Sequence, residues 1–421
     1  CGWGPIMASL HCSTATLSRI LFSPLAGVAA SCAAFRHCPA LSDQSWLELG
    51  VLRLLHDLPS GRALLQQLGP LVPECPARSL LFETLRSDRR LKLCEQASAR
   101  IVEQVGGDAL AEYPALADFD LYAADGHWHS AAIHDRPLDG SRHAVGHFYA
   151  MNLRTGAVRP LTAAQGKKEH DMHALKRQQL QRLRWDAPKG RKVLYAYDAA
   201  GIDFAQWHRW KHTGGVYFIS VTKENMRLEV IAENPFDAAD AINAGVIADE
   251  LVATSQHVAV RRVRFRDHAT GRDFEFLTSE LTLPPGLIAF LYRRRWDLEK
   301  SFDEFKNKLG QTRAWASSAT AKAMQAQLLC LTYNLIKLFE THLAQHHQLS
   351  NQAELDRRQQ RRQRHQANAT AAGCSLPAAV LAWQRLTQTS LKLYRWLRAF
   401  FFSQLPLEAL LPALRASYAS L

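Results

Sequence analysis

The spacing of apolar residues divides the chain into regions with different patterns. From residue 41 to about 110, Leu and Val recur every three or four positions, as in "SDQSWLELGVLRLLHDL", which begins with a serine typical of a helix N-cap. "SGRALLQQLG" and "ARSLLFETLRSDRRLKLCEQASARIVEQV" continue the pattern between short Pro/Gly interruptions. We therefore expect a helical domain of three or four helices over residues 41–112.

From residue 117 the pattern changes to short runs rich in Tyr, Val, Phe and Leu. "ADFDLYAADGHWH", "HAVGHFYAMNLRTGAVRPLTA" and "RKVLYAYDAAG" predict strands, with Arg154-Thr155-Gly156 as a hairpin turn and a polar helix before the third run. Two strands, a hairpin and then helix–strand are the beginning of a mixed α/β sheet. Further strand-like runs, "GVYFISVTK", "HVAVRRVRFRD" and "RDFEFLTSEL", lie between residues 215 and 283.

The last third of the chain reads as helical. Pro284-Pro285-Gly286 interrupts the chain, and one long helix is expected from there to Gly310, a typical C-cap. The apolar "AKAMQAQLLCLTYNLIKLFETHLAQ" predicts another helix. A basic linker is expected at 346–375 and a helical segment at 376–421. The arginines of "RRQQRRQRH" are either solvated or in contact with a phosphate backbone, and both interpretations stay open.

Composition and charge narrow the class of protein. The chain has 421 residues, of which 47% are apolar and 21% charged, as in a globular protein of two or three domains. Lys and Arg outnumber Asp and Glu by 51 to 39, a net charge of +12 that favours a polyanionic partner such as nucleic acid. The eight cysteines form no CxxC pair, which argues against a zinc site or a redox pair and for reduced thiols.

The first forty residues form a region of their own. "ILFSPLAGVAASCAAF" resembles the apolar part of a signal peptide, but Ser, Pro and Gly interrupt it and it is too short to span a membrane. We expect residues 1–40 to be a poorly ordered upstream or non-native extension. No later stretch reaches 18 apolar residues, so no transmembrane helix is expected.

Two aspartates follow apolar strands in the same way, Asp125 in "YAADGHW" and Asp198 in "YAYDAAG". Ligands of open α/β sheets bind at the carboxyl ends of strands, and paired acids there can hold a hard divalent cation. An Asp before Gly or Ala is also an ordinary turn residue. Three other aspartates are rivals for the same role, although none closes an apolar run: Asp120, Asp135 and Asp203.

The stretch "LYRRRWDLEKSFDEFKNKLG" aligns four polar residues on a helix. With 100° per residue from Tyr292, the other three fall within a stripe of about 60°: Arg295, Glu299 and Lys306. An Arg295–Glu299 pair on a surface would contribute only ~0.3–0.5 kcal/mol. Asp303 is a rival carboxylate near the stripe. Five residues are assigned to the solvent face: Arg294, Asp297, Ser301, Glu304 and Lys308.

This row suits phosphate chemistry. Glu299 would be a metal ligand and Arg295 a bidentate phosphate clamp, with Lys306 as a second cation and Tyr292 as a hydroxyl donor. Trp296 lies beside the stripe and either stacks on a DNA base or packs half-buried against the protein. The alternating arginines 261, 262, 264 and 266 either face DNA or are solvated. The histidines near the first strands (127, 129, 134, 143 and 147) and His170/His173 read as satisfied or exposed rather than as zinc ligands.

At these residues the sequence resembles a family. Tyr292, Arg295, Glu299 and Lys306 match the Y-x2-R-x3-E-x6-K signature of bacterial "YREK" insertion-sequence transposases, a branch of the DDE transposase/integrase superfamily. Asp125 and Asp198 match the other two acids of the family, and the resemblance extends over about 117–340. The long gap between Asp198 and Glu299 is similar to that of members with a β-rich subdomain inserted before the last acid.

The resemblance implies an α/β, RNase H-like catalytic domain at 113–345 with a β-rich insertion at about 215–283, flanked by the helical regions. Its three carboxylates would hold two Mg²⁺ (or Mn²⁺) ions for cutting double-stranded DNA at transposon ends and joining the ends to a target.

The resemblance also implies roles for the flanking regions. The 41–112 region would bind the terminal inverted repeats, and the C-terminal helices would help to pair a homodimer in the bacterial cytoplasm, at the nucleoid. Two rivals are a decayed or domesticated DNA-binding protein of the same fold, and an RNase H-like nuclease of repair or RNA.

Overall fold

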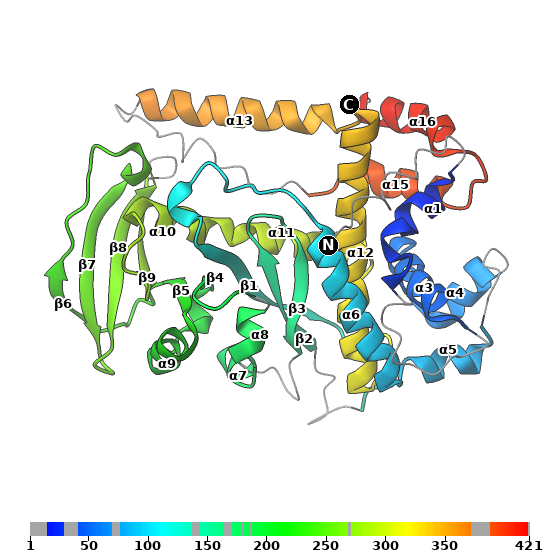
Figure 1. Ribbon diagram of the computed structural model, residues 1–421, viewed down its shortest axis with the longest axis horizontal. Helices are drawn as coiled ribbons and strands as arrows, with labels where there is room; N and C mark the ends of the chain where they lie inside the picture. The colour runs from blue at the N-terminus through cyan, green and yellow to red at the C-terminus, as the bar shows by residue number, and fades with distance from the viewer. Residues whose placement is uncertain are drawn as a thin grey trace.

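A single mixed sheet with helices on both faces forms the centre of the protein (Figure 1). The computed structural model describes residues 15–28, 41–69, 76–136, 144–163, 171–178, 180–185, 187–267, 271–371 and 388–419. The expected α/β class is confirmed: nine strands run in the order β3-β2-β1-β4-β5-β9-β8-β7-β6. Their bounds are β1 Phe119–His129, β2 Val145–Asn152, β3 Val158–Ala163, β4 Lys192–Ala196, β5 Val216–Val221, β6 Leu228–Glu233, β7 Val246–Thr254, β8 Ala259–Asp267 and β9 Arg272–Thr278.

The first five strands alternate apolar residues between two buried faces. β1 pairs antiparallel with β2 and parallel with β4, and β5 continues parallel to β4. The expected hairpin turn lies between β2 and β3, where Gly156 has a φ of +73° that glycine adopts without strain. Because side chains alternate along a strand, Leu121 and Ala123 face one core while Tyr122 and Ala124 face the other.

Different helices cover the two faces. On the Tyr122 side lie α7 Asp171–Lys176, α8 Leu180–Arg184 and α9 Phe204–Gly214, so the expected polar helix before β4 is two short helices in the described residues. The larger core on the Leu121 side contains α10 Pro285–Arg294, α11 Trp296–Asn307 and α12 Ala319–His347. The site discussed below lies on this side of the sheet.

The insertion extends the central sheet instead of forming a separate unit. β9 pairs antiparallel with β5 over three residue pairs, and β8, β7 and β6 follow outward as an antiparallel ladder (Figure 1). The sequence runs 216–221, 259–267 and 272–278 were expected as strands and are strands. β6 and β7 were not expected, because their residues do not alternate cleanly between apolar and polar.

The N-terminal helices pack against α12. Residues 41–112 contain α3 Asp43–Leu55, α4 Gly61–Leu68, α5 Arg78–Thr84 and α6 Asp88–Gln104, and Ser42 caps α3 by accepting from the N–H of Ser45 at 3.1 Å. α3 and α6 contact α12. Residues 15–28, inside the segment expected to be poorly ordered, form α1 Leu17–Phe22 and η2 Ser23–Leu25, whose apolar side chains are buried. Residues 1–14 lie outside the described part.

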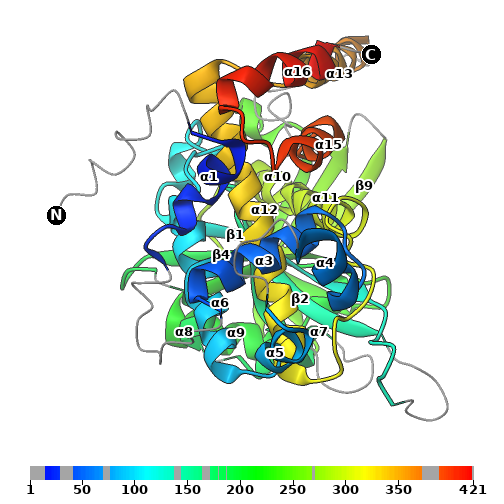
Figure 2. The ribbon, with the colours of Figure 1, turned by 90° about the vertical axis from the view of Figure 1, so that its right-hand side faces the viewer.

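The C-terminal region returns to the body of the chain. α15 Leu391–Phe400 and α16 Leu407–Ala419 lie beside α1 and α12 (Figures 1 and 2), and the N–H of Leu407 donates to the carbonyl of Ala15 at 2.9 Å. The expected basic linker is helical over α13 Gln352–Ala371, and residues 372–387 lie outside the description. Among the described helices, none has the length and apolar content needed to span a membrane.

Candidate active site

Asp125 and Asp198 lie at the same level of two adjacent parallel strands. Ala123 of β1 is in register with Ala196 of β4, and each aspartate comes two residues later. The carboxylate of Asp125 accepts from the N–H of Gly126 at 2.8 Å, and that of Asp198 accepts from the N–H of Ala200 at 2.9 Å. Asp198 thus acts as a turn residue and also stands at the end of its strand, so both interpretations of its sequence pattern apply.

The expected long helix is broken in two at Arg295. α10 ends at Arg294 and α11 begins at Trp296, with the N–H of Arg295 bonded to the carbonyl of Tyr292 at 3.1 Å. This i→i+3 bond tightens one turn without reversing the chain, since Arg295 keeps helical angles. The angular positions expected for a continuous helix are therefore largely preserved.

Arg295 joins the strand acid to the helix acid. Its Nη1 lies 2.5 Å from Oδ2 of Asp125 and 2.9 Å from Oε1 of Glu299. The Arg295 side chain is 8% exposed, whereas that of Glu299 is 33% exposed. One buried guanidinium is thus shared by carboxylates that lie 174 positions apart in sequence, and Glu299 faces outward from the same point.

The electrostatics show that Asp198 belongs to the same cluster. Burial raises the pKa of Asp125 to about 7, and Asp198 and Glu299 also raise it, while Arg295 lowers it. Burial raises the pKa of Tyr292 as well, with Arg295 opposing and Asp198 and Asp125 reinforcing the rise. Three carboxylates from β1, β4 and α11 therefore repel one another around one arginine.

Tyr292 and Lys306, the other two residues of the helical row, lie on either side of Arg295 and Glu299 along the helix. Tyr292 is buried with its ring 4.9 Å from that of Phe276, and Lys306 is exposed near the C-terminal end of α11. Trp296 is 46% exposed and its ring lies 5.7 Å from the Arg295 guanidinium carbon. Trp296 is thus about half buried beside the cluster, and this exposure fits both stacking on a base and half-buried packing.

The rival acids have structural partners away from the cluster. Asp120 pairs with Arg191 at 2.6 Å, and Asp135 pairs with Lys322 at 3.1 Å. Asp203 caps α9 and pairs with Lys176. Asp303 accepts from Asn307 and, at 2.8 Å, from Gln388. Each of these four carboxylates therefore has a hydrogen-bond or ion-pair partner outside the cluster.

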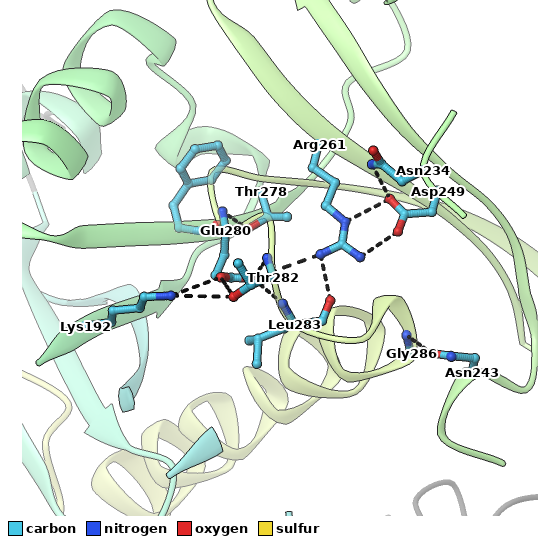
Figure 3. A network of polar contacts seen from close by, with 11 residues as sticks. Lys192, Asn234, Asn243, Asp249, Arg261, Thr278, Glu280, Thr282, Leu283 and Gly286 are labelled. Atoms are coloured by element: carbon cyan, nitrogen blue, oxygen red, sulfur yellow. Dashed lines mark hydrogen bonds and ion pairs between the residues drawn. The ribbon is translucent and has the colours of Figure 1, made fainter. Parts of the chain in front are cut away.

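A buried polar network fixes the loop before α10 (Figure 3). Arg261 of β8 binds Asp249 of β7 through two bonds of 2.8 and 2.6 Å and donates to the carbonyl of Leu283 at 2.7 Å. Glu280, 1% exposed, accepts from the N–H of Leu283 at 2.7 Å and lies 3.5 Å from Lys192 of β4. The insertion, the central sheet and the start of α10 therefore meet at this network.

The basic strand β8 is neutralised by acids on both neighbouring strands. Beyond the buried Arg261–Asp249 pair, Arg262 binds Glu250 at 2.7 Å, Arg266 binds Asp273 at 2.8 Å, and Arg264 lies 3.9 Å from Glu275. The two interpretations of the sequence were a DNA-facing and a solvated strand; Arg261 and Arg262 are withdrawn from the surface, whereas Arg264 and Arg266 remain 44% and 56% exposed beside their acid partners.

The face of α11 that was assigned to solvent is largely buried, so that expectation is wrong. Four of its five residues are at most 3% exposed: Arg294, Asp297, Ser301 and Glu304. Arg294 and Asp297 pair at 2.6 Å, and Glu304 accepts from the N–H of Thr389 at 2.9 Å and the hydroxyl of Tyr394 at 3.2 Å. Arg294, Asp297 and Ser301 have partners three residues away on the same helical stretch, whereas the partners of Glu304 come from a distant part of the chain.

Three histidines, the half-buried His127 and the buried His129 and His147, extend the strand face that bears Asp125. His127 and His129 follow it at two-residue steps, and His147 is in register with His127 across β2. Burial lowers the pKa of His127 and His129 to about 4, so both are neutral at pH 7. Nε2 of His127 is buried without a hydrogen-bond partner in the described residues, and its ring stacks on Phe302 at 4.8 Å. Satisfied or exposed histidines were expected, and these three are neither, whereas His134 is exposed. His143 and His170 lie outside the described residues.

The cluster offers only oxygen ligands. Carboxylate oxygens suit Mg²⁺ or Mn²⁺ better than the softer metals, and mutual repulsion of three carboxylates is relieved by a cation. Within the part of the chain that the structure describes, no three His, Cys, Asp or Glu side chains are grouped as a metal site requires. A cation at this point would therefore have to replace the Arg295 guanidinium on Asp125 Oδ2 and Glu299 Oε1.

Comparison with known proteins gives one family. A model described as "Transposase DDE domain" matches residues 120–335, half of the chain, from β1 to the middle of α12. Asp125, Asp198 and Glu299 all fall within this range. No curated protein matches the sequence.

Proposed function

Since this chain belongs to the transposase DDE domain family, we propose that it is an active transposase of the bacterial YREK type that cuts DNA at transposon ends and joins the 3′ ends to target DNA. The family is one of metal-dependent DNA-cleaving enzymes within the RNase H-like superfamily. The observation that carries the proposal is the convergence of Asp125 and Glu299 on one arginine, with Asp198 within electrostatic range.

Asp125, Asp198 and Glu299 are the proposed catalytic carboxylates and metal ligands. Two Mg²⁺ or Mn²⁺ ions at this site would supply activation of the attacking oxygen and stabilisation of the leaving oxygen in an in-line displacement at phosphorus. Glu299 is the more exposed of the two acids that share Arg295, so it faces the side from which DNA would approach. Asp125 lies within β1 and Asp198 two residues after β4, and backbone N–H groups bind both carboxylates and fix their positions.

Arg295, Tyr292 and Lys306 are proposed to grip the DNA backbone beside the scissile bond. The planar guanidinium of Arg295 matches a phosphate in two bonds. When Arg295 leaves the carboxylate oxygens of Asp125 and Glu299, its guanidinium would bind two oxygens of a DNA phosphate instead. The exposed Lys306 and Trp296 flank the cluster on the surface of α11, where a phosphate and a base can reach them.

The wider assembly is also a proposal. Residues 41–112 would bind the terminal inverted repeats as double-stranded DNA, and a homodimer in the bacterial cytoplasm would hold two ends together. The C-terminal helices pack on their own chain, so a second copy would meet their outer surfaces.

The test is Mg²⁺-dependent cleavage of DNA carrying the inverted repeats that flank the gene. We expect Asp125→Ala, Asp198→Ala and Glu299→Ala each to reduce cutting by several orders of magnitude while leaving end binding intact. Asp120→Asn, a change on the same strand as Asp125, is the matched control and should cut normally. Binding of ends by the wild-type protein without any metal-dependent nicking would favour the decayed, non-enzymatic alternative.

A further inference from the structure

The C-terminal segment 388–394 binds the side of α11 that faces away from the carboxylate cluster. Glu304 lies about 140° around the helix from Glu299. Its Oε1 accepts from the N–H of Thr389 at 2.9 Å, and its Oε2 accepts from the hydroxyl of Tyr394 at 3.2 Å. All three residues are at most 1% exposed, so these bonds form in the interior.

Further bonds attach the same segment to the C-terminal half of α11. Lys308 donates to the carbonyl of Thr389 at 2.6 Å, and Gln388 donates to the carbonyl of Lys300 at 2.7 Å. The hydroxyl of Thr389 donates to Glu340 of α12 at 2.9 Å. Segment 388–394, which includes the first turn of α15, therefore connects α11 to α12. Figure 2 shows α11, α12 and α15.

The junction between α10 and α11 departs from regular α-helix at Arg295. The chain between the two helices passes through the tightened turn at Arg295, and a change of hydrogen-bond pattern inside a helix often marks a hinge. On the sheet side, α11 contacts Tyr149 and His127 through the rings of Phe302 and Phe305. Hydrogen bonds from segment 388–394 add directional constraints on the opposite side of the helix, because they weaken steeply when their geometry is distorted.

Burying the carboxylate of Glu304 costs desolvation free energy. An apolar side chain at 304 would pack with less desolvation, and buried polar groups are best attested as devices that fix one register among several. Glu304 accepts a backbone N–H and a hydroxyl from a segment 85 and 90 positions away. It therefore specifies one rotation and one axial position of α11.

We propose that segment 388–394 is a strap that sets the position of α11, and that Glu304 and Thr389 are positioning residues for Glu299. The statement about Glu299 rests on the proposed function. The strap acts through the helix: it fixes the side chain of Glu299 relative to Asp125 without touching either DNA or metal.

The experiment compares three full-length variants with the wild-type protein. Glu304→Leu removes both acceptors, and Glu304→Gln keeps an acceptor for the Thr389 N–H. Leu183→Ala makes a cavity in the other core, on α8, and serves as the control for a general loss of stability. Gln388→Ala removes two bonds at the edge of the strap and replaces Glu304→Leu if that variant does not fold.

Two measurements separate a strap from ordinary packing. Hydrogen–deuterium exchange should rise in peptides covering 296–307 for Glu304→Leu and not for Leu183→Ala. Mn²⁺ affinity, followed by electron paramagnetic resonance without DNA, should fall about tenfold or more for Glu304→Leu, as for other outer partners of metal ligands. Glu304→Gln should remain close to the wild type both in the exchange of peptides covering 296–307 and in Mn²⁺ affinity.

Other results would overturn the proposal. Equal exchange in the two destabilised variants would show that the segment does not hold α11, and unchanged Mn²⁺ affinity would show that its position does not matter for Glu299. If the wild-type protein binds no Mn²⁺ and cuts no DNA, the proposed function fails, and the exchange comparison alone then decides whether the strap holds α11.

Discussion

Arg295 contacts two of the proposed metal ligands and is also the proposed phosphate clamp. Its guanidinium satisfies Asp125 and Glu299, and its Nε is buried without a partner in the described residues. A divalent cation bound by these carboxylates, as proposed, would compete with the guanidinium for Asp125 Oδ2 and Glu299 Oε1. A DNA phosphate that attracts Arg295 would therefore strengthen metal binding, and by linkage the metal would strengthen DNA binding.

Replacing Arg295 should separate these two effects. We expect Arg295→Gln to bind Mn²⁺ more tightly than the wild type in the absence of DNA, because the competing cation is gone. DNA cleavage should nevertheless fall by about 10²-fold, the usual effect of losing one charge-stabilising donor. Calorimetric titration with Mn²⁺ and single-turnover cleavage measure the two quantities.

The control is Arg264→Gln, which removes the same charge from an arginine whose neighbour is Glu275 at 3.9 Å. Its Mn²⁺ affinity should equal that of the wild type. Weaker Mn²⁺ binding by Arg295→Gln would mean that the arginine organises the carboxylates instead of competing for them.

Glu304 should make stability depend on pH. Burial raises the pKa of Glu304 to about 7, Lys308 and Lys337 lower it, Glu340 raises it, and the Thr389 N–H lowers it. Because the folded protein holds this proton more tightly than the unfolded chain, its contribution is complete below the ordinary pKa of 4.5 and is lost as the pH rises through 7. The tyrosines that share this environment, 333 and 394, have pKa values raised above their ordinary range by burial.

Urea unfolding of the wild type and of Glu304→Gln at pH 5 and pH 8 tests this. Relative to the variant, the wild type should lose up to about 3 kcal/mol of unfolding free energy between the two values. Asp125 is unchanged in both proteins, so its own titration cancels in the difference. Parallel stability curves would show that Glu304 does not titrate in this range.

At the residue scale, the sequence predicts what depends on nearby residues. Asp125 and Asp198 could be found because an apolar run leads up to each acid, although β1 continues through Asp125 to His129. The Arg295–Glu299 alignment follows from helix geometry alone. Glu304 was assigned to the wrong face, because a helical projection contains no information about a covering segment 85 residues later. Asp297 was also assigned to solvent, but it is buried in an ion pair with Arg294. His127 carried a weak signal, namely its two-residue step from Asp125 on one strand face.

At the scale of elements, the insertion is fixed to the start of α10. The N–H of Gly286 donates to Asn243 at 3.1 Å, and a Cβ at this glycine would lie 1.7 Å from the carbonyl oxygen of Ile242. Arg261 and Glu280 hold the loop that precedes it (Figure 3). Movement of the insertion would thus be transmitted to the helix that leads to Arg295.

Gly286→Ala should force the insertion away from α10. We expect a loss of about 1–3 kcal/mol in unfolding free energy, as for other overpacked positions, and slower DNA cleavage. Gly106→Ala is the matched control, since a Cβ there meets nothing within 4 Å, and it should be neutral. Denaturant unfolding and cleavage assays of both variants test this prediction. Equal behaviour of the two variants would refute the close approach of the Gly286 and Ile242 backbones.

Element boundaries were predictable where local signals exist. Pro284-Pro285-Gly286 does mark the start of α10, with Pro284 as its N-cap, and Gly156 does turn the β2–β3 hairpin. The break at Arg295 has no local signal, because it consists of two shifted hydrogen bonds, Arg295 to Tyr292 and Leu298 to Arg295, within otherwise helical backbone. The strands β6 and β7 were missed because their burial is decided by pairing at the sheet edge, not by alternation.

At the scale of the whole molecule, the net charge of +12 is unevenly compensated. The arginines of β8 have acid partners on neighbouring strands, whereas α13 exposes three arginines at positions 357, 361 and 364. These three fall within a stripe of about 60° along about 10 Å of helix. Only Arg357 of the three has an ion pair among the described residues, with Glu354 at 3.1 Å.

α13 should therefore contribute to DNA affinity by neutralising phosphates. The triple variant Arg357→Ala/Arg361→Ala/Arg364→Ala should bind end DNA more weakly, and the slope of log affinity against log salt should decrease by roughly 0.9 for each phosphate that α13 no longer neutralises. Its unfolding midpoint should not change, because the three side chains are exposed. Arg266→Ala is the matched control: its charge is already neutralised by Asp273 at 2.8 Å, so the slope should change little. An unchanged slope in the triple variant would identify α13 as a solvated helix and would move the search for the basic DNA surface to the N-terminal helices.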